Sequence, residues 1–476
     1  MVCLFYVREE LIGRLLFSAR MIVSMANKNV TDMTVGNPTR HILKFTIPLL
    51  IGNLFQQLYN MVDSIVVGRF VSAHALAAVG ACGSLNFLFF SLSSGLAVGI
   101  GVIAAQYFGA GDEKQLKKTI ANSIYVLASS ALVVTLIGLI FAGPILRLLQ
   151  TPDEYIADSI NYFRVTSIGI LGVAFYNGVA ALFRAIGDSK TPLYFLILSS
   201  IINVCLDLVF VLAFDMGVVG VALATIIAQA VSAIASIIYA YRKISYFKLS
   251  KKDLVPDYSM IKDSFRLGSP VAMQNSMIAV SCISLQAVVN GFGPDVASAY
   301  TISGRIEQLV QQPYGSLGMA LTSYSGQNIG AKKQERVIEG FRKATMIVLC
   351  FSMIMLPLFF FFGKYICGIF VTENDAAAVI TLGARALRIT SPFYFGLGMI
   401  YVPRAVLNGC GDTGFAMING LTEVVCRIAF ANVLTRIPAL GYWGIWMTTG
   451  LTWAVTAIVC VMRYRGGKWK YKALEH

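Results

Sequence analysis

Runs of about 20 apolar residues recur along the chain from Ile42 to Val461, each separated from the next by a short polar segment. An α-helix needs about that many apolar residues to cross the hydrocarbon core of a bilayer. In hydrocarbon every backbone polar group must be bonded within the protein, so such runs form helices. The composition agrees, with 57% hydrophobic and 13% charged residues, against roughly 25% charged in a soluble domain. We therefore expect an all-α polytopic membrane protein whose surface faces the lipid bilayer.

Glycine, proline and charged residues divide the apolar sequence into about twelve expected spans, six in each half. These are residues 43–68, 77–105, 119–142, 161–183, 192–213 and 217–240, then 266–290, 296–326, 344–366, 386–408, 414–435 and 441–462. We expect an N-terminal cytoplasmic segment (1–40), an N-lobe (41–240), a linker (241–265), a C-lobe (266–463) and a basic tail (464–476). Residues 1–24 suit neither a signal peptide nor a span, so Met25 is an alternative start.

The loops between the expected spans alternate in charge, and cytoplasmic loops are the ones that retain Lys and Arg. The basic set includes Lys114, Lys190, the 241–262 connection, Lys332 and the C-terminal tail. The other set is acidic and includes Asp153, Glu154, Asp215, Asp295 and Glu373. We expect a multi-pass protein of the cell (cytoplasmic) membrane with the basic loops and both termini in the cytoplasm.

Short sequences recur in the two halves at nearly constant offsets. Arg164-Val-Thr-Ser returns as Arg388-Ile-Thr-Ser (388 − 164 = 224), and Gly187-Asp188 returns as Gly411-Asp412 at the same offset. The segments 106–110 and 327–331 share Gln, Gly and Ala at an offset of 221. Six spans per half insert both halves in the same direction, so a pseudo-two-fold axis along the membrane normal relates them. Convergent apolar composition is the alternative, but a duplication predicts a transport path between two lobes.

Several classes of protein are disfavoured by the polar residues. The net charge of +14 resides in short loops, so we expect no nucleic-acid partner. The nine cysteines have neither metal-ligand nor CxxC spacing. His41, His74 and His476 lie outside the span interiors, which argues against a metal site. Because no nucleophile, metal or cofactor motif is found, we expect a protein that is not an enzyme and has no cofactor.

Two carboxylates lie inside expected spans of the first half. An ionisable group in a span costs several kcal/mol unless it is paired or wetted, so each is a candidate for function. Asp63 follows Tyr59 by one turn, and Asp207 follows Asn203 by one turn. Carboxylates beside amides and hydroxyls suit proton exchange or coordination of a small cation. The alternatives are an interfacial Asp63 near Arg69 and a structural Asp207.

The second half is charged differently, and we favour a structural role for its charged residues. Arg305 and Glu307 lie in the eighth span, and Glu423 and Arg427 have the i, i+4 spacing of a direct pair in the eleventh. Pro48 and Pro270 interrupt the first span of each half and permit a gating bend or a static kink. Candidates for a substrate cavity are Tyr59, Gln57, Asn53, Tyr162, Tyr176, Met273 and Arg404.

Five motifs in a fixed order show a family resemblance between residues 37 and 465. They are Pro48…Tyr59…Asp63…Gly68, Gln106…Gly109-Ala110, Arg184-Ala-Ile-Gly-Asp-Ser-Lys-Thr-Pro192, Gln327-Asn-Ile-Gly-Ala331 and Gly409-Cys-Gly-Asp-Thr413. Each motif is modest alone, but their order and the duplication make the match specific. The chain resembles a bacterial multidrug and toxic compound extrusion (MATE) transporter of the DinF-like/MepA-like branch.

The resemblance implies a V-shaped pair of six-helix lobes that alternates access. It also implies an ion-coupling site in the N-lobe. The motif positions of the DinF-like branch are matched here by Asp63, Asn177, Asn203, Asp207 and Thr225. Four of these residues, Asp63, Asn203, Asp207 and Thr225, are the candidate Na⁺ ligands. The NorM-like branch has acidic residues in its seventh and tenth spans, where this chain has Ile278 and Leu397. That departure argues against coupling in the C-lobe.

The function implied is a secondary active multidrug efflux antiporter, a functional monomer that exports lipophilic, mostly cationic small organic substrates in exchange for H⁺ or Na⁺. The alternative is a lipid or lipid-linked saccharide flippase of the same superfamily, which needs a strongly cationic cavity. Only Arg305, Arg404 and Arg427 could supply that charge. A receptor or channel would leave the parallel duplication and the paired acidic sites unexplained.

Overall fold

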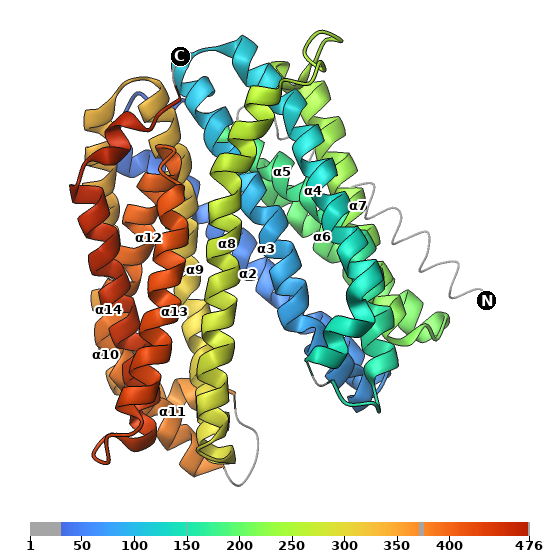
Figure 1. The fold of residues 1–476 in the computed structure, drawn as a ribbon, viewed down its shortest axis with the longest axis vertical. Coiled ribbons are helices and arrows are strands. Elements are labelled where there is room, and N and C mark those ends of the chain that lie inside the picture. The colour runs from blue at the N-terminus through green and yellow to red at the C-terminus, as the bar shows by residue number, and fades with distance from the viewer. Residues whose placement is uncertain (1–29, 150, 371–375, 475–476) are drawn as a thin grey trace. The chain divides into compact units, whose positions relative to one another are not determined.

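The computed structural model describes residues 30–149, 151–370 and 376–474, and all regular structure in these ranges is helical (Figure 1). The alternative start at Met25 lies outside the described residues. The first six helices are α2 (Pro38–Phe70), α3 (Ala73–Ala110), α4 (Glu113–Leu148), α5 (Ile156–Ala185), α6 (Lys190–Leu208) and α7 (Gly217–Lys243), with a π-helical turn at Val209–Ala213. The expected all-α class is confirmed.

The remaining helices follow a short 3₁₀ turn at Ser245–Phe247. They are α8 (Tyr258–Asn290), α9 (Pro294–Gly330), α10 (Gln334–Gly368), α11 (Ala376–Thr390), α12 (Tyr394–Gly409), α13 (Gly414–Leu434) and α14 (Gly444–Arg465), with 3₁₀ turns at Ser391–Phe393, Gly441–Trp443 and Lys468–Tyr471. Each expected span therefore overlaps helix, and the tenth is divided between α11 and α12.

Nine helical segments of the described ranges are long and apolar enough to cross a membrane. The other three expected spans correspond to α2, α9 and the α11–α12 pair. Large apolar side chains are exposed on the helices, among them Ile140, Phe361 and Ile458. Such side chains suit contact with lipid tails, since transfer from water to hydrocarbon favours them. The chain is therefore a multi-pass membrane protein.

The tenth expected span, 386–408, is wrong as a single helix. The α-helical pattern ends at Thr390 and starts again at Tyr394, with a 3₁₀ turn between them. Pro392 lies in that turn and has no N–H to donate. The side-chain hydroxyls of Thr390 and Ser391 donate to the carbonyls of residues 387 and 388, at 3.5 and 3.3 Å. Local side-chain donors thus replace part of the helical bonding at the break.

The chain forms two compact units that do not follow chain order. Unit 1 contains Ile51–Ala97 and Glu113–Ile261, whereas unit 2 contains Met33–Leu50, Val98–Asp112 and the chain from Lys262 onward. Both α2 and α3 are therefore divided between the units. The lobes expected from the repeat are defined by chain order, whereas these units are defined by packing. Each unit is described below by itself.

In unit 1, α5 packs against α4 and α7, and α6 packs against α7 (Figure 1). Glycines allow the close approach: a Cβ on Gly138 of α4 would lie 2.2 Å from Ser167 Oγ of α5. A Cβ on Gly172 of α5 would lie 3.3 Å from the backbone of Ala230 on α7. Small residues at helix crossings are typical of membrane bundles, where dispersion and hydrogen bonds hold helices together.

The repeated Gly-Asp motif follows the end of a helix in each half. The aspartate of the first copy contacts the start of the next helix, and that of the second copy contacts α14. Gly187 has φ +83°, a conformation that glycine adopts without strain. Asp188 Oδ1 accepts the N–H groups of Lys190 (3.0 Å) and Thr191 (2.9 Å), so it caps the N-terminus of α6. The equivalent Asp412 instead accepts hydrogen bonds from Nε and Nη2 of Arg463, both at 2.8 Å. The same motif therefore has different partners in the two halves.

We expect Asp188→Ala to lower the free energy of unfolding by about 1–2 kcal/mol, because two N–H groups lose their acceptor. Asp188→Asn should lose less, since an amide oxygen can still accept them. Burial also raises the pKa of the Asp188 carboxyl. Thermal unfolding of the detergent-purified protein measures both, with the exposed Asp153→Ala as control. Equal losses for Ala and Asn would contradict the cap.

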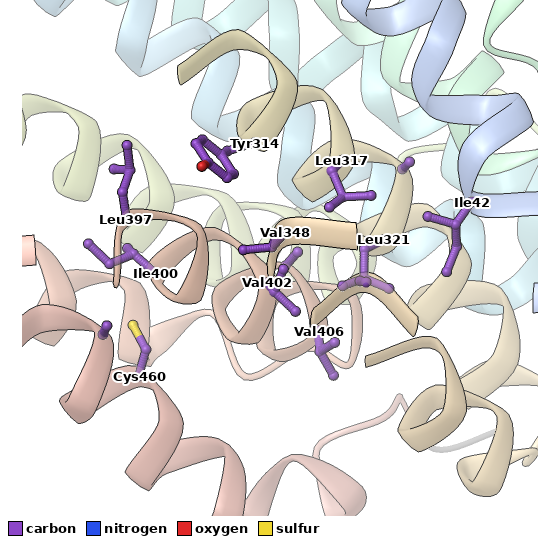
Figure 2. Packing of buried hydrophobic residues seen from close by; sticks show 14 of the residues in the cluster. Ile42, Tyr314, Leu317, Leu321, Val348, Leu397, Ile400, Val402, Val406 and Cys460 are labelled. Carbon is purple, nitrogen blue, oxygen red and sulfur yellow. The ribbon is translucent and has the colours of Figure 1, made fainter. Parts of the chain in front are cut away.

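The core of unit 2 is an apolar cluster between α9, α10, α12 and α14, to which the first part of α2 adds Ile42. Figure 2 shows these side chains meeting between the helices. The labelled members are Ile42, Tyr314, Leu317, Leu321, Val348, Leu397, Ile400, Val402, Val406 and Cys460. Leu397 is thus a packing residue.

The repeated Gln-x-x-Gly sequence marks a crossing of α3 and α9 within unit 2. A Cβ on Gly109 would lie 1.9 Å from the carbonyl oxygen of Gln327. A Cβ on Gly330 would lie 2.0 Å from the carbonyl oxygen of Gln106. Each glycine therefore meets the backbone of the other motif's glutamine. The two glutamine side chains accept N–H groups from segments far away in sequence, Gln106 from Leu474 (2.9 Å) and Gln327 from Met33 (2.9 Å).

Candidate functional site

The carboxyl groups of Asp63 on α2 and Asp207 on α6 face each other inside unit 1. The two side chains are within hydrogen-bonding range of one another. Asp207 has no exposed surface, and Asp63 is half-buried with an inaccessible Oδ1. Two carboxyl groups can share a hydrogen bond only if one of them holds a proton. The two side chains therefore form a pair of adjacent acidic groups inside unit 1.

Polar side chains from three helices surround this pair. Thr225 Oγ1 on α7 accepts hydrogen bonds from Tyr59 Oη and Asn203 Nδ2, both at 3.3 Å, and donates to the carbonyl of residue 221 at 3.1 Å. The Tyr59 hydroxyl is also within hydrogen-bonding range of Asp63. The structure thus brings together Tyr59, Asp63, Asn203, Asp207 and Thr225, which the sequence places on α2, α6 and α7.

Four buried oxygens of this cluster accept no hydrogen bond within the described residues: Asp63 Oδ1, Asn203 Oδ1 and both carboxyl oxygens of Asp207. Within the same ranges, neither carboxylate forms an ion pair with Lys, Arg or His. Burying charge without a partner is costly, and two adjacent carboxylates cannot both stay ionised without a compensating cation. The geometry therefore fits a bound proton or a small cation with oxygen ligands.

The other first-half candidates lie near this cluster or in helix contacts. Asn177 on α5 is half-buried. Tyr162 packs against the valine cluster formed by Val66, Val67, Val211, Val218 and Val221. Tyr176 Oη donates to the carbonyl of Pro192 at 3.1 Å, which ties α5 to α6. Asn53 and Gln57 are half-buried on α2.

The second-half candidates belong to unit 2, as does Pro48. Arg404 lies 4.6 Å over the ring of Tyr401, and Met273 is exposed on α8. Pro48 and Pro270 lie inside α2 and α8, both of which continue past the proline. These residues therefore do not share the compact unit of the carboxylate pair.

Of the four charged residues singled out in spans of the second half, two form an ion pair and two do not pair with each other. Arg427 Nη2 lies 2.7 Å from Glu423 Oε1, as the i, i+4 spacing predicted. Arg305 is exposed whereas Glu307 is buried. Two residues apart on a helix, they point about 200° from one another and cannot pair. Sequence analysis treated Glu307 as structural, and this opposite placement on the helix was the signal that distinguishes it from Arg305.

Comparisons with known proteins agree on one group of transporters. A family model described as MatE matches residues 48–209 and 270–433. The chain is 27% identical over 441 residues to the probable multidrug resistance protein YpnP of Bacillus subtilis, covering 92% of this chain and 97% of that protein. It is 24% identical over 420 residues to the multidrug export protein MepA of Staphylococcus aureus, covering 84% and 92%.

Solved structures share the same fold. One is described as the outward-facing conformation of a multidrug resistance MATE family transporter of the MOP superfamily, with a TM-score of 0.85, 24% identity and coverage of 93% of this chain and 99% of that chain. A MOP superfamily transporter from Pyrococcus furiosus also has a TM-score of 0.85 at 24% identity, with coverage of 92% and 97%. These similarities show a common helical architecture.

Proposed function

Since the chain belongs to the MatE family of multidrug and toxic compound extrusion transporters, we propose that it is a secondary active antiporter. It exports lipophilic, mostly cationic organic compounds in exchange for H⁺ or Na⁺, by alternating access. Its basic loops and both termini face the cytoplasm, and it works as a monomer.

The observation that supports this proposal best is the set of four buried oxygens without hydrogen-bond donors at Asp63, Asn203 and Asp207. They need positive charge, and an exchanging ion can supply it and remove it again. A cation that enters from outside neutralises the pair, and release to the cytoplasm restores the negative charge. Because Asp63 is on α2 and Asp207 is on α6, the charge state of the pair alters the packing between these two helices.

In this mechanism the coupling ion and an organic cation compete for the negative charge of the carboxylate pair. A negative carboxylate pair attracts a lipophilic cation electrostatically, and a neutralised pair does not. Tyr59 is positioned to transmit the change, because its hydroxyl contacts both Thr225 and Asp63. Ion binding therefore favours drug release, and the half-buried Asn53 and Gln57 of α2 are proposed to contact the drug.

The flippase alternative has less support from the charged residues. A cavity for lipid-linked phosphates needs free cations. Arg427 is neutralised by Glu423 at 2.7 Å, and Arg404 lies over the Tyr401 ring. Two of the three arginines that could attract phosphate are thus engaged in other contacts, and Arg305 alone is exposed among the three.

Transport by the purified full-length chain in proteoliposomes tests the proposal. We expect ethidium to move against its own gradient when an H⁺ or an Na⁺ gradient is imposed, and the effective gradient identifies the ion. A protonophore or a sodium ionophore should abolish the signal, and empty liposomes provide the baseline. If neither gradient drives ethidium or another lipophilic cation, the antiporter proposal is wrong.

A further inference from the structure

Unit 2 contains a buried carboxyl group that the antiport mechanism does not use. Glu307 of α9 is 9% exposed, and its Oε1 accepts no hydrogen bond from any described residue. The Thr390 hydroxyl is within hydrogen-bonding range of the Glu307 carboxyl and also of the Tyr394 phenol. Tyr394 is fully buried, and its own hydroxyl makes no well-aligned hydrogen bond inside the described ranges. Two buried polar groups thus flank one threonine.

The charges around Glu307 do not balance. Arg427 of α13 is near enough to interact electrostatically with Glu307, but its guanidinium is 2.7 Å from Glu423, and both side chains of that pair are less than a tenth exposed. One buried cation therefore faces two buried carboxyl groups. If both were ionised, the region would hold a net negative charge in a medium that strongly disfavours it.

The helices packed around α9 supply no second cation to Glu307. On α11, Arg385 lies over the Trp443 ring at 4.4 Å, and Arg388 Nε donates to the carbonyl of Phe360 at 2.9 Å. On α12, Arg404 lies over Tyr401. On α14, Trp446 Nε1 donates to Ser303 Oγ at 3.0 Å. These side chains are occupied elsewhere.

The remaining ionisable and polar neighbours are neutral. Tyr300 of α9 and Tyr394 of α12 interact electrostatically with Glu307, but neither can offset a negative charge. On α10, Ser352 is bonded to Tyr314 Oη at 2.8 Å. Among the described residues, Arg427 is therefore the cation that acts on Glu307, and it is also paired with Glu423.

Glu307 also faces the break between α11 and α12. Thr390 is the last residue of α11, and Tyr394 is the first of α12. The Thr390 hydroxyl donates to the carbonyl of Leu387 at 3.5 Å, so its lone pairs are available to accept a hydrogen bond from a protonated Glu307. Broken helices in membrane transporters supply such polar groups to ion sites, because a continuous helix would keep them bonded internally.

We propose that Glu307 is a second proton-binding site, in which its neutral carboxyl donates to the Thr390 hydroxyl. The proton removes the excess negative charge beside the Glu423–Arg427 pair. When the proton leaves to water, the carboxylate has no cation to itself among the described residues, because Arg427 is paired with Glu423. The site lies in unit 2, apart in the chain and in packing from the Asp63–Asp207 pair, and it does not depend on the antiport proposal.

Infrared spectroscopy of the detergent-purified full chain tests this site directly. The carbonyl stretch of a protonated carboxyl is resolved from that of a carboxylate, and ¹³C labelling of the glutamate side-chain carboxyls shifts glutamate bands away from aspartate bands. At neutral pH we expect one ¹³C-sensitive protonated-carboxyl band in the wild type, and we expect Glu307→Gln to remove it. The exposed Glu339→Gln on α10 is the matched control and should keep the band.

Two results would overturn the proposal: the wild type shows no ¹³C-sensitive protonated band at neutral pH, or the band persists in Glu307→Gln. The isotope measurement on the wild type needs no variant to fold. Because a proton held by the Asp63–Asp207 pair would contribute only unlabelled bands, failure here is distinct from failure of the antiport mechanism. Likewise, absence of ethidium transport would leave the glutamate band unaffected.

Discussion

Asp63→Asn will abolish ion-driven export while the protein still folds. We expect the ethidium transport rate to fall by roughly 100-fold or more, which corresponds to a barrier increase of about 2.7 kcal/mol. The physical reason is that an amide neither binds and releases a proton nor supplies negative charge to a cation. Asp207 would then lack the neighbouring carboxyl group of the proposed coupling pair. Rates in proteoliposomes under the effective gradient measure the change.

Asp153→Asn is the matched control, because Asp153 is an exposed carboxylate between α4 and α5. It makes the same chemical change away from the site and should transport at the wild-type rate. Ligand-induced thermal stabilisation by ethidium shows whether Asp63→Asn still binds substrate. Wild-type coupled export by Asp63→Asn would refute the coupling role of the pair.

Gly330→Ala will disrupt the crossing of α3 and α9. The new Cβ would lie 2.0 Å from the carbonyl oxygen of Gln106, and no side-chain rotation can relieve a clash with backbone. Overpacking costs about 1–3 kcal/mol, occasionally more, and a clash with backbone that no side-chain rotation relieves belongs at the upper end. We therefore expect a large loss of monodisperse protein after extraction, and a lower unfolding temperature in whatever is recovered.

Gly304→Ala tests the same change in the same helix without the clash, since a Cβ on Gly304 of α9 has no atom within 4 Å. Alanine also has the better helix propensity, so this variant should be as stable as the wild type. Size-exclusion profiles and thermal unfolding compare the two. Equal stability of Gly330→Ala and Gly304→Ala would mean that the crossing is looser than described.

The spans could be predicted from the sequence because hydrocarbon accepts few other structures, but the break in α11–α12 could not. Pro48, Pro270 and Pro403 lie within helices that continue past them, whereas Pro392 lies in a break. Whether a proline breaks a helix depends on what replaces the lost bonds. At this position the hydroxyls of Thr390 and Ser391 donate to nearby carbonyls, and the presence of a hydroxyl in the sequence does not show that it will do so.

The residues of the candidate site could be predicted from the sequence, but the contact between its two carboxyl groups could not be predicted from spacing along a helix. Asp63 and Asp207 were singled out because charged groups are rare in spans, and the resemblance added Thr225. That the two carboxyl groups face each other depends on the packing of α2 against α6, which spacing along one helix cannot show. Glu307 was grouped with Arg305 by proximity in sequence, although the helical period places them on opposite sides.

The reciprocal contact of Gly109 with Gln327 and of Gly330 with Gln106 has the form of an isologous interface, in which one surface patch recognises a copy of itself. A single Gln-x-x-Gly sequence supplies both sides of it. A six-helix protein with this sequence could therefore have dimerised through it before gene fusion joined two copies. On this view the crossing of α3 and α9 has the form of a subunit interface within one chain, and each glycine is constrained by the glutamine backbone of the other motif.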